Sequence, residues 1–339
     1  MPRLFKTQIT HDLGIIHPII QGGMGWVGCE IAAAVSNAGG LGMICAGTHA
    51  QEGGPEGLRA LIQKCKTLTD KPFGVNFLLL NNSVDYMKIA QVVIDENIPC
   101  VETAGRPPPP ELLKMLKSNN TYIIHKVTAI RHALAAEKAG VDAIEVAGFD
   151  LGGHPGEKDV GNWILLTKAG KTLTKPWIAA GGNATGEQLA AALTMGASGI
   201  NMGTRFMATQ ECQVGDEIKE SIVNGSENST ELLMRGYNTL RVFKNTAAVE
   251  AKKIEIDSGN QIGLAKVNSE YKGLLADNPG ANTRKAMQGK MNQDEAVWSA
   301  GQAMGLIDDI PTCKELIENI VEEAAIALER GTSLLASSM

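Results

Sequence analysis

The chain has 339 residues, a formal net charge of −6 and 44% hydrophobic residues. This length fits a single (β/α)8 barrel, and the hydrophobic content suffices for a large core. Lys and Arg form no block, which argues against nucleic-acid binding. Residues 1–12 lack the apolar stretch of a secretion signal, and no run approaches membrane-spanning length, so we expect a cytoplasmic protein that does not contact membranes.

Short apolar runs alternate with helix-forming segments over the first 210 residues. We expect eight strands, at residues 18–21, 41–46, 73–79, 100–103, 122–127, 143–146, 177–180 and 199–202. Helices are expected at residues 29–37, 55–68, 84–96, from 111 onwards, and at 129–139, 163–169 and 187–195. A repeat of roughly 20–30 residues suits parallel strands joined by helices. The sequence therefore predicts an α/β fold, a (β/α)8 TIM barrel, with an open doubly wound sheet as the rival.

Residues 211–300 break this rhythm. They are more polar, with the stretch N-G-S-E-N-S-T and the basic pieces R-G-Y-N-T-L-R and A-K-K. We interpret them as an appended, mostly helical subdomain that helps to select the substrate and lies over the barrel formed by residues 1–210. An amphipathic helix within residues 311–337 is expected to close the barrel.

Two successive strands end in glycine turns, at Gly181-Gly182 and at Gly203-Thr204. Such turns expose backbone N–H groups and let an anion approach without a Cβ in the way. In a (β/α)8 barrel the loops after strands seven and eight are the usual phosphate site. These turns therefore predict a clamp for the phosphate of a cofactor.

Polar and glycine residues also follow the other strands, where barrel active sites are built. They are Gln21, Gly22, Gly23 and Met24 after the first strand, Asn76 on the third, His125 and Lys126 on the fifth, and Gly152, Gly153 and His154 after the sixth.

Lys126 and His154 are the strongest candidates among these residues. A lysine on a buried strand needs an anionic partner, which is either Glu145 or Asp142 or an anionic group of a cofactor. His154 lies in the permissive loop G-G-H-P-G-E and is either a surface histidine or a general base. His125 points to the other side of its strand from Lys126, so we expect a packed, hydrogen-bonded histidine there.

Other reactive residue types give weaker signals. The six cysteines are scattered singly within apolar runs, which is typical of small buried side chains. The remaining histidines, among them His11, His17 and His132, lack metal-ligand spacing, so no metal site is expected. Ser299 has no context for a nucleophile, and we place it with Gln302 at the roof of a substrate pocket.

Six motifs in order resemble the nitronate monooxygenase (2-nitropropane dioxygenase) family. They are P-I-I-Q-G-G-M, G-V-N-F, I-I-H-K-V, A-G-F-D-L-G-G-H-P-G, I-A-A-G-G and I-N-M-G-T-R-F, and W-S-A-G-Q near Trp298 matches more weakly. The resemblance implies a (β/α)8 barrel that binds FMN. It implies that Gly181, Gly182, Gly203 and Thr204 hold the FMN phosphate.

The same resemblance assigns the residues around the isoalloxazine ring. Gln21 to Met24, Asn76 and Lys126 would surround the ring, with the cation of Lys126 stabilising negative charge on it. Gly152 and Gly153 would let the ring approach the backbone. His154 would be the catalytic base or would orient the substrate.

Three functions remain open from the sequence. The first is FMN-dependent oxidation of alkyl nitronates, such as propionate 3-nitronate, by O2 to a carbonyl compound and nitrite. The second is NAD(P)H:quinone or enoyl reduction on the same barrel, since the family includes both activities. The third is a non-redox barrel enzyme that binds a phosphorylated metabolite. Each takes a small-molecule substrate, and a homodimer is compatible with all three.

Overall fold

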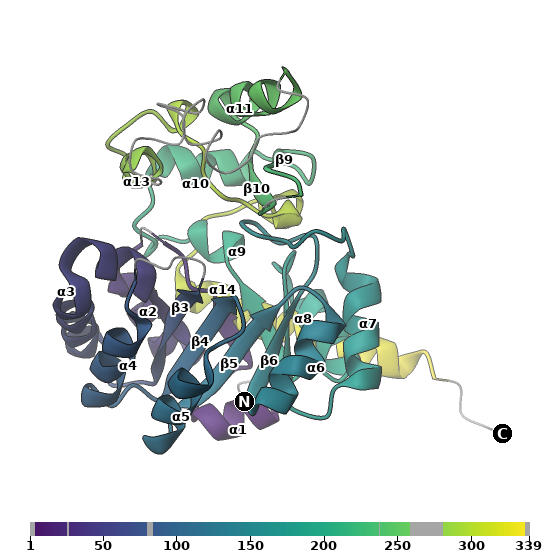
Figure 1. The fold of residues 1–339 in the computed structure, drawn as a ribbon. Helices are drawn as coiled ribbons and strands as arrows, with labels where there is room; N and C mark the ends of the chain where they lie inside the picture. The colour runs from purple at the N-terminus through teal and green to yellow at the C-terminus, as the bar shows by residue number, and fades with distance from the viewer. Residues whose placement is uncertain (1–3, 26, 80–83, 237, 258–280, 336–339) are drawn as a thin grey trace.

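The computed structural model describes residues 4–25, 27–79, 84–236, 238–257 and 281–335 (Figure 1). Eight parallel strands form one sheet: β1 (Ile19–Gln21), β2 (Gly42–Cys45), β3 (Phe73–Leu79), β4 (Cys100–Gly105), β5 (Tyr122–Val127), β6 (Ala143–Ala147), β7 (Trp177–Ala180) and β8 (Gly199–Met202). All eight predicted strands are confirmed, and their mostly apolar runs suit parallel strands that are buried on both faces.

The sheet closes on itself. Its strand order runs β1-β8-β7-β6-β5-β4-β3-β2, and a parallel bridge between Ile20 and Leu41 joins the two ends. Backbone hydrogen bonds of 2.9 Å from Gln21 to Leu41 and from Leu41 to Ile19 reinforce that seam. The (β/α)8 barrel is therefore confirmed, and the doubly wound alternative is wrong because β1 pairs with β8 on one side and meets β2 on the other.

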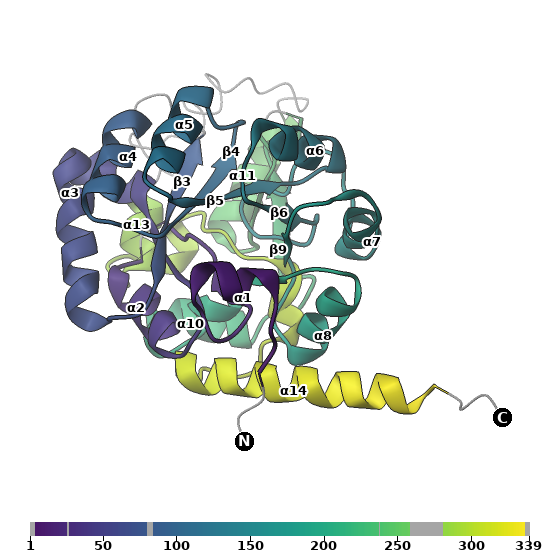
Figure 2. The same cartoon turned by 90° about the horizontal axis from the view of Figure 1, so that it is seen from below.

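Helices surround the barrel and separate its strands. They are α2 (Cys29–Asn37), α3 (Ala46–Leu68), α4 (Tyr86–Asp95), α5 (Pro110–Ser118), α6 (Ile130–Ala139), α7 (Asn162–Thr172), α8 (Gly186–Thr194) and α9 (Thr204–Met207). The C-terminal helix α14 (Cys313–Ser333) lies beside α2 and α8 (Figure 2). Helix α3 begins earlier than predicted. Its helical conformation is interrupted at Gly54, whose φ is 61°, immediately before the predicted start at Pro55.

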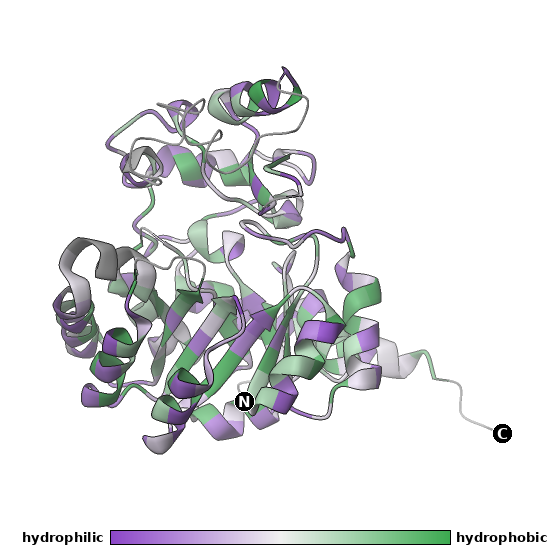
Figure 3. Cartoon of the chain, viewed as in Figure 1, coloured by the Kyte–Doolittle hydropathy of each residue, from purple (hydrophilic) through white to green (hydrophobic). Residues whose placement is uncertain are grey.

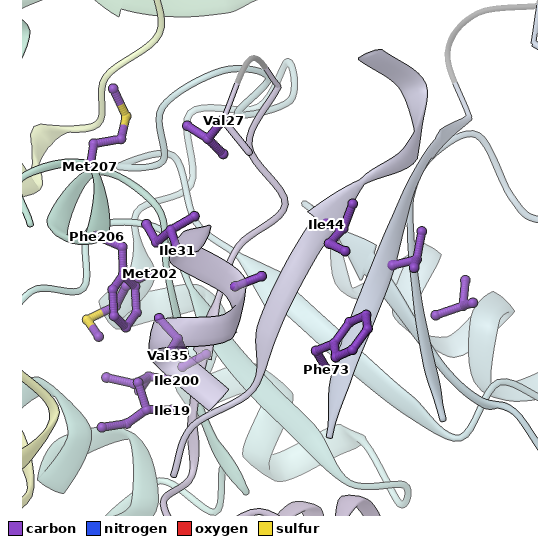
Figure 4. Packing of buried hydrophobic residues seen from close by; sticks show 14 of the residues in the cluster. Ile19, Val27, Ile31, Val35, Ile44, Phe73, Ile200, Met202, Phe206 and Met207 are labelled. Atoms are coloured by element: carbon purple, nitrogen blue, oxygen red, sulfur yellow. The ribbon is translucent and has the colours of Figure 1, made fainter. Parts of the chain in front are cut away.

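Two apolar layers hold the barrel together. Outside the strands, Ile19 and Ile200 pack against Ile31 and Val35 of α2 (Figure 4). Inside, the lower end is filled by apolar side chains from several strands, including Ile124 and Ile178. The short helix α1 (Gln8–Leu13), which the sequence did not predict, adds Ile9 and Leu13 to this inner cluster and closes the lower end (Figure 2).

The described part of residues 211–300 lies above the ends of the strands (Figure 1). Their described part contains α10 (Asp216–Val223), α11 (Thr246–Asp257), α13 (Ala281–Met287) and a short 3-10 turn, η1 (Gln293–Glu295). It also contains an antiparallel hairpin that was not predicted, β9 (Thr230–Leu233) and β10 (Leu240–Phe243). A second 3-10 turn, η2 (Gln302–Leu306), leads back towards α14. Residues 258–280 of this predicted subdomain lie outside the described part.

The contact between β2 and α2 gives a test of this packing. A Cβ added at Gly42 would lie 2.0 Å from the carbonyl oxygen of Ala32, which is backbone and cannot swing away. We expect Gly42→Ala to lower the free energy of unfolding by roughly 1–3 kcal/mol or more, as overpacking does. Thermal unfolding of the purified variant measures the effect.

Gly47→Ala is the matched control. Its added Cβ would meet only the Tyr86 hydroxyl, at 4.0 Å, and Gly47 lies within α3. Alanine in a helix is favoured by about 0.5–1 kcal/mol over glycine, so this variant should unfold at the same temperature or slightly higher. Equal losses in the two variants would contradict the described packing.

Candidate active site

The glycine turns after β7 and β8 lie side by side at the upper end of the barrel, which we call the rim. Strands β7 and β8 are parallel neighbours, so Gly181 and Gly203 leave the sheet at the same end. Gly181 and Gly182 have φ values of 81° and 72°, a conformation that other residues rarely adopt. Among the described residues, the N–H groups of Gly182 and Gly203 donate to no protein acceptor. The rim therefore has donors free for an anion.

Directly above the inner apolar cluster lies a polar layer, made of Asn76, Glu102, Lys126, Glu145 and Asn201. Figure 3 shows hydrophilic bands interrupting the hydrophobic strands. The Lys126 Nζ lies 2.6 Å from Glu102 Oε1 and 3.0 Å from Glu145 Oε1. Both carboxyl groups are fully buried, whereas the Lys126 side chain is 21% exposed. Lys126 is thus the member of the layer that extends towards the opening.

Two amides complete the polar layer. Asn76 Nδ2 donates to Glu102 Oε2 at 2.9 Å, and Asn201 Nδ2 donates to Glu145 Oε2 at 2.8 Å. The layer follows from the strand period of two: Glu102 stands two residues beyond Cys100, and Lys126 two beyond Ile124, both of which lie in the inner apolar cluster.

The charges of the layer shift one another's protonation. Burial alone would lower the pKa of Lys126, but Glu102 and then Glu145 raise it, so the lysine is charged. Burial and the adjacent Glu102 raise the pKa of Glu145 well above its usual value. Burial also acts to raise the pKa of Glu102, but Lys126 and a hydrogen bond with Glu145 outweigh it and lower that pKa. One carboxyl is thus held charged and the other neutral.

The contacts of Lys126 show which of the two predicted carboxylate partners, Glu145 or Asp142, lies beside it. Glu145 is confirmed as a partner of Lys126, with its Oε1 3.0 Å from Nζ. Asp142 is wrong, because it pairs with Lys117 at 2.7 Å on the outside of the barrel. His125, expected to be packed and hydrogen-bonded, is confirmed: it is buried, and its Nδ1 lies 2.8 Å from the Thr103 hydroxyl. Burial lowers the pKa of His125 to about 4, so it is neutral.

The segment after β1 packs closely on this layer. A Cβ on Gly22 would lie 2.7 Å from Asn201 Oδ1, and one on Gly23 would lie 2.3 Å from Asn76 Cβ. Met24 is partly buried against the core. Gln21 is buried in the seam, where its Oε1 accepts a hydrogen bond of 3.0 Å from the Met43 N–H. Its side chain thereby supplies a link between β1 and β2, in addition to its predicted place at the cofactor.

His154 lies in the loop after β6, and the appended hairpin holds this loop. Gly153 and Arg241 of β10 exchange two backbone hydrogen bonds, of 3.0 and 2.6 Å. His154 Nδ1 lies 3.1 Å from the Thr239 carbonyl, which can only accept, so Nδ1 carries the hydrogen. Burial lowers the pKa of His154, so the imidazole is neutral and Nε2 has a free lone pair. This is the tautomer a general base requires.

Glu157 anchors the hairpin to the same loop. Its carboxylate accepts hydrogen bonds from the Thr239 N–H at 2.8 Å, the Thr239 hydroxyl at 2.5 Å and the Gly236 N–H at 3.1 Å. Partial burial would raise the pKa of Glu157, but the Thr239 hydrogen bonds lower it, so it is ionised. Arg241 adds a contact: its guanidinium lies 4.6 Å from the centre of the Phe149 ring.

The other end of the loop is tied to the rim and to residues 300–302. The Asn162 amide donates to the Gly181 carbonyl, and Gln302 N–H donates to the Asp150 carbonyl at 3.0 Å. Gly152 packs against backbone, since a Cβ there would lie 2.5 Å from the Ala300 carbonyl carbon. Gly153 has φ of 84° and open space around its Cβ position.

The predicted pocket residues lie on the segment that meets this loop. Gly301 N–H donates to the Thr204 hydroxyl at 2.9 Å, which joins the segment to the turn after β8. Ser299 is exposed, and Gln302 is half-buried with its amide 3.5 Å from the Glu227 carbonyl. The structure therefore brings Gly152, Thr204 and Gln302 to one place, at the edge of the rim.

Several predictions about reactive residues can be compared with the structure. All six cysteines are buried and free, which confirms the structural interpretation. Within the described ranges, no group of three or more His, Cys, Asp and Glu is arranged to hold a metal ion. No helix among the described residues is both long and apolar enough to cross a membrane.

Sequence reasoning missed several residues that shape the site. Glu102 could have been found from the sequence, because a charged residue within an apolar strand needs a partner for the same reason as Lys126. Asn201 gave a similar but weaker signal. Thr239 and Glu157 gave no sequence signal, because their hydrogen bonds form only through the unpredicted hairpin. Arg205 is buried and joins Asp309 at 2.8 Å, which holds α9 to the segment before α14.

Comparison with known proteins fits this geometry. The Nitronate monooxygenase family matches residues 6–323, almost the whole chain. The chain belongs to the nitronate monooxygenase family. It is accordingly a redox enzyme, and enzymes of this family are flavin-dependent.

Individual relatives carry different names within the family. A protein of Rhodococcus jostii named (3aS,4S,5R,7aS)-5-hydroxy-7a-methyl-1-oxo-octahydro-1H-indene-4-carboxyl-CoA dehydrogenase is 34% identical, over 94% of this chain and 96% of its own. A probable nitronate monooxygenase of Staphylococcus haemolyticus is 31% identical, over 67% of this chain and 74% of its own. The solved structure of FabK from Thermotoga maritima has 34% identity and a TM-score of 0.85, covering 98% of this chain and all of that one.

The contact between Glu157 and the hairpin generates a prediction about the stability of the segment that holds His154. We expect Glu157→Ala to release the amides of Thr239 and Gly236, because the carboxylate that accepts from both is removed. Each hydrogen bond contributes about 1 kcal/mol, so hydrogen exchange at these amides should quicken roughly fivefold or more. Exchange followed by mass spectrometry measures this.

Asp159→Asn is the control for Glu157→Ala, because asparagine, like aspartate, tolerates the φ of 50° at this position. Asp159 pairs with Arg235 at 2.5 Å, but both side chains are nearly half exposed, and such surface pairs contribute little. Exchange at Thr239 should therefore stay close to that of the unchanged protein. If the two variants exchange alike, Glu157 is not the anchor of the hairpin.

Proposed function

We propose that this chain is an FMN-dependent oxidoreductase with the cofactor seated on the rim. The residues present fit the group. The free N–H groups of Gly182 and Gly203 suit a phosphate, and a Cβ at Gly203 would meet nothing within 4 Å, so space remains above that turn. Gly181 and Thr204 complete the phosphate set. Lys126 reaches towards the same opening with its partly exposed side chain.

The chain's own residues would act on the ring and the substrate from two sides. When bound, FMN accepts two electrons from the substrate and passes them on. Lys126 stays charged beneath it because Glu102 and Glu145 raise its pKa. Gly22, Gly23 and Met24 border the polar layer, where the two glycines let the chain pack directly on Asn201 and Asn76.

His154 would remove the proton that oxidation requires. Its Nδ1–H is engaged by Thr239, and its neutral Nε2 can accept a proton from a carbon beside an electron-withdrawing group. The carbon next to a nitro group is such a carbon, as is the carbon next to a thioester carbonyl. This fixed, neutral imidazole is the observation that carries the proposal.

Oxidation of alkyl nitronates and the nitroalkanes that form them is the function we propose first. The product would be a carbonyl compound and nitrite, with O2 as the final acceptor. A preformed nitronate such as propionate 3-nitronate is anionic and needs no base. His154 would then orient it, whereas for a neutral nitroalkane His154 would deprotonate it.

Redox chemistry on an acyl thioester is the second candidate. Two relatives named as CoA-thioester dehydrogenases, from Rhodococcus jostii and Mycobacterium tuberculosis, are 34% and 32% identical. They match over 94% and 97% of this chain, and so include most of the appended residues 211–300, whose described part lies over the rim. This favours a thioester substrate, in either the oxidative or the reductive direction with NAD(P)H.

Anaerobic mixing with separate reductants tests the substrate class. The purified protein should show flavin absorbance, and propionate 3-nitronate should bleach it without NADH. An acyl-CoA that bleaches it instead would favour the second candidate. Bleaching by NADH alone, with turnover of benzoquinone or an enoyl thioester, would indicate a reductase. A colourless protein that binds no added FMN would contradict every flavin-based function.

His154→Asn separates base catalysis from binding. General bases contribute roughly 10²–10⁴ in rate, so reduction by neutral nitroethane should slow at least about 100-fold. Reduction by the preformed nitronate should slow far less, because no proton has to leave. For the unchanged enzyme, the nitroethane rate should hold at pH values below 6.5, since the pKa of His154 is lowered and the base form persists there. Equal slowing with both substrates would refute the role of His154 as a base.

A further inference from the structure

The polar layer buries more negative than positive charge. Glu102 and Glu145 are fully buried, and both lie within 3.0 Å of Lys126 Nζ. Among the described residues, Lys126 is the only cation within ion-pair distance of either carboxyl. If both carboxyls were ionised, the layer would carry one uncompensated negative charge in the barrel interior. An unpaired charge of that kind is among the most costly features a protein interior can hold.

The hydrogen bonds of the two carboxyls point to how that charge is removed. Their Oε2 atoms each accept from an amide, Asn76 for Glu102 and Asn201 for Glu145. Their Oε1 atoms are buried and receive no well-directed hydrogen bond, although Lys126 Nζ lies close to both. A single proton on one Oε1, directed at the other, would satisfy both atoms at once.

Among the described residues, the side chains next to the layer offer no other proton or charge to do this. On the neighbouring strands, His125 faces outward and is neutral, with a pKa lowered by burial to about 4. Cys100, which lies below the layer, has a pKa raised well above its usual value by burial, so its thiol is uncharged. The layer therefore consists electrically of Lys126 and the two carboxyls alone.

We propose that Glu102 and Glu145 share one proton, held on Glu145, and that this proton makes Lys126 available to an anionic group on the rim. With the proton present, Glu102 balances Lys126, the layer is neutral, and the ammonium attracts negative charge above it. Without the proton the layer carries a net negative charge and repels that group. For a flavin on the rim, this rests on the proposed function.

The affinity of the rim for an anionic group, and the potential of a flavin bound there, should therefore depend on pH. Because burial and Glu102 raise the pKa of Glu145, the proton leaves only as the pH rises through that raised value. Affinity for negative charge on the rim should therefore fall at high pH. Glu145→Gln keeps the size and uncharged state of the protonated acid, and its amide can still donate to Glu102. In this variant the affinity for negative charge on the rim should therefore no longer fall at high pH.

Infrared spectroscopy of the purified holoenzyme tests the shared proton directly. At pH 8, where ordinary carboxyls are ionised, the unchanged protein should show the C=O stretch of a protonated carboxylic acid. Glu145→Gln should lack this band. Glu102→Gln should lack it too, because Glu145 then ionises to pair with Lys126, and it serves as the second variant if Glu145→Gln does not fold.

The matched control is Glu323→Gln on α14, outside the layer, where the carboxylate accepts from Gly186 N–H at 2.9 Å. It should retain the band. A wild-type spectrum without the band, or a band that persists in both Glu102→Gln and Glu145→Gln, would overturn the shared proton.

The midpoint potential of the bound flavin, measured against pH, tests whether the shared proton affects negative charge on the rim. Above the pKa of the pair, the potential of the unchanged protein and of Glu323→Gln should fall more steeply with pH than that of Glu145→Gln. Parallel curves in all three proteins would overturn the link from the proton to the rim. If the protein binds no flavin but shows the infrared band, the proposed function fails and the shared proton stands.

Discussion

The ion cluster of Lys126, Glu102 and Glu145 is the constraint on which the rest of the site depends. Two carboxyl groups within 3.0 Å of one ammonium nitrogen, in the interior of a barrel, are not a stabilising device, because desolvation offsets most of the attraction between them. Hydrophobic residues of similar size would hold the barrel at least as well. The cluster therefore indicates a need for charge at this place.

The barrel explains why this charge lies where a cofactor would use it. The lower interior is closed by α1 and apolar side chains, so the polar layer can open only upwards, to the rim. There the glycine turns after β7 and β8 leave backbone donors free, and the loop after β6 brings in His154. The hairpin of residues 230–243 sets the tautomer of His154 through Thr239. Barrel and appended segment thus contribute different parts of the proposed site.

Much of the fold could be predicted from the sequence because it depends on local patterns. The eight strands are short, mostly apolar runs, several of them ended by glycine, and their number and spacing admit few other arrangements. The need of Lys126 for an anionic partner followed from the cost of burying a charge, and Glu145 was one of the candidates. Glu102 follows from the same rule, yet within its short strand it was treated only as part of an apolar run.

The contacts made by residues 211–300 could not be predicted in the same way. The hairpin has weakly patterned strands, with Thr230 and Arg241 among its eight residues, and it is stabilised by the loop it packs on. Asp309 and Arg205 are about a hundred positions apart in the chain. Pairings of this kind depend on tertiary structure alone, and a single sequence contains no periodic signal for them. For the same reason the role of Gln21 in the β1–β2 seam was not expected.

The structure of the protein crystallised with FMN tests the central claim most directly. We predict the phosphate within hydrogen-bond distance of the N–H groups of Gly182 and Gly203, the ring above Lys126, and His154 across its open face. A flavin bound elsewhere, or a ring separated from Lys126 by protein atoms, would contradict the account.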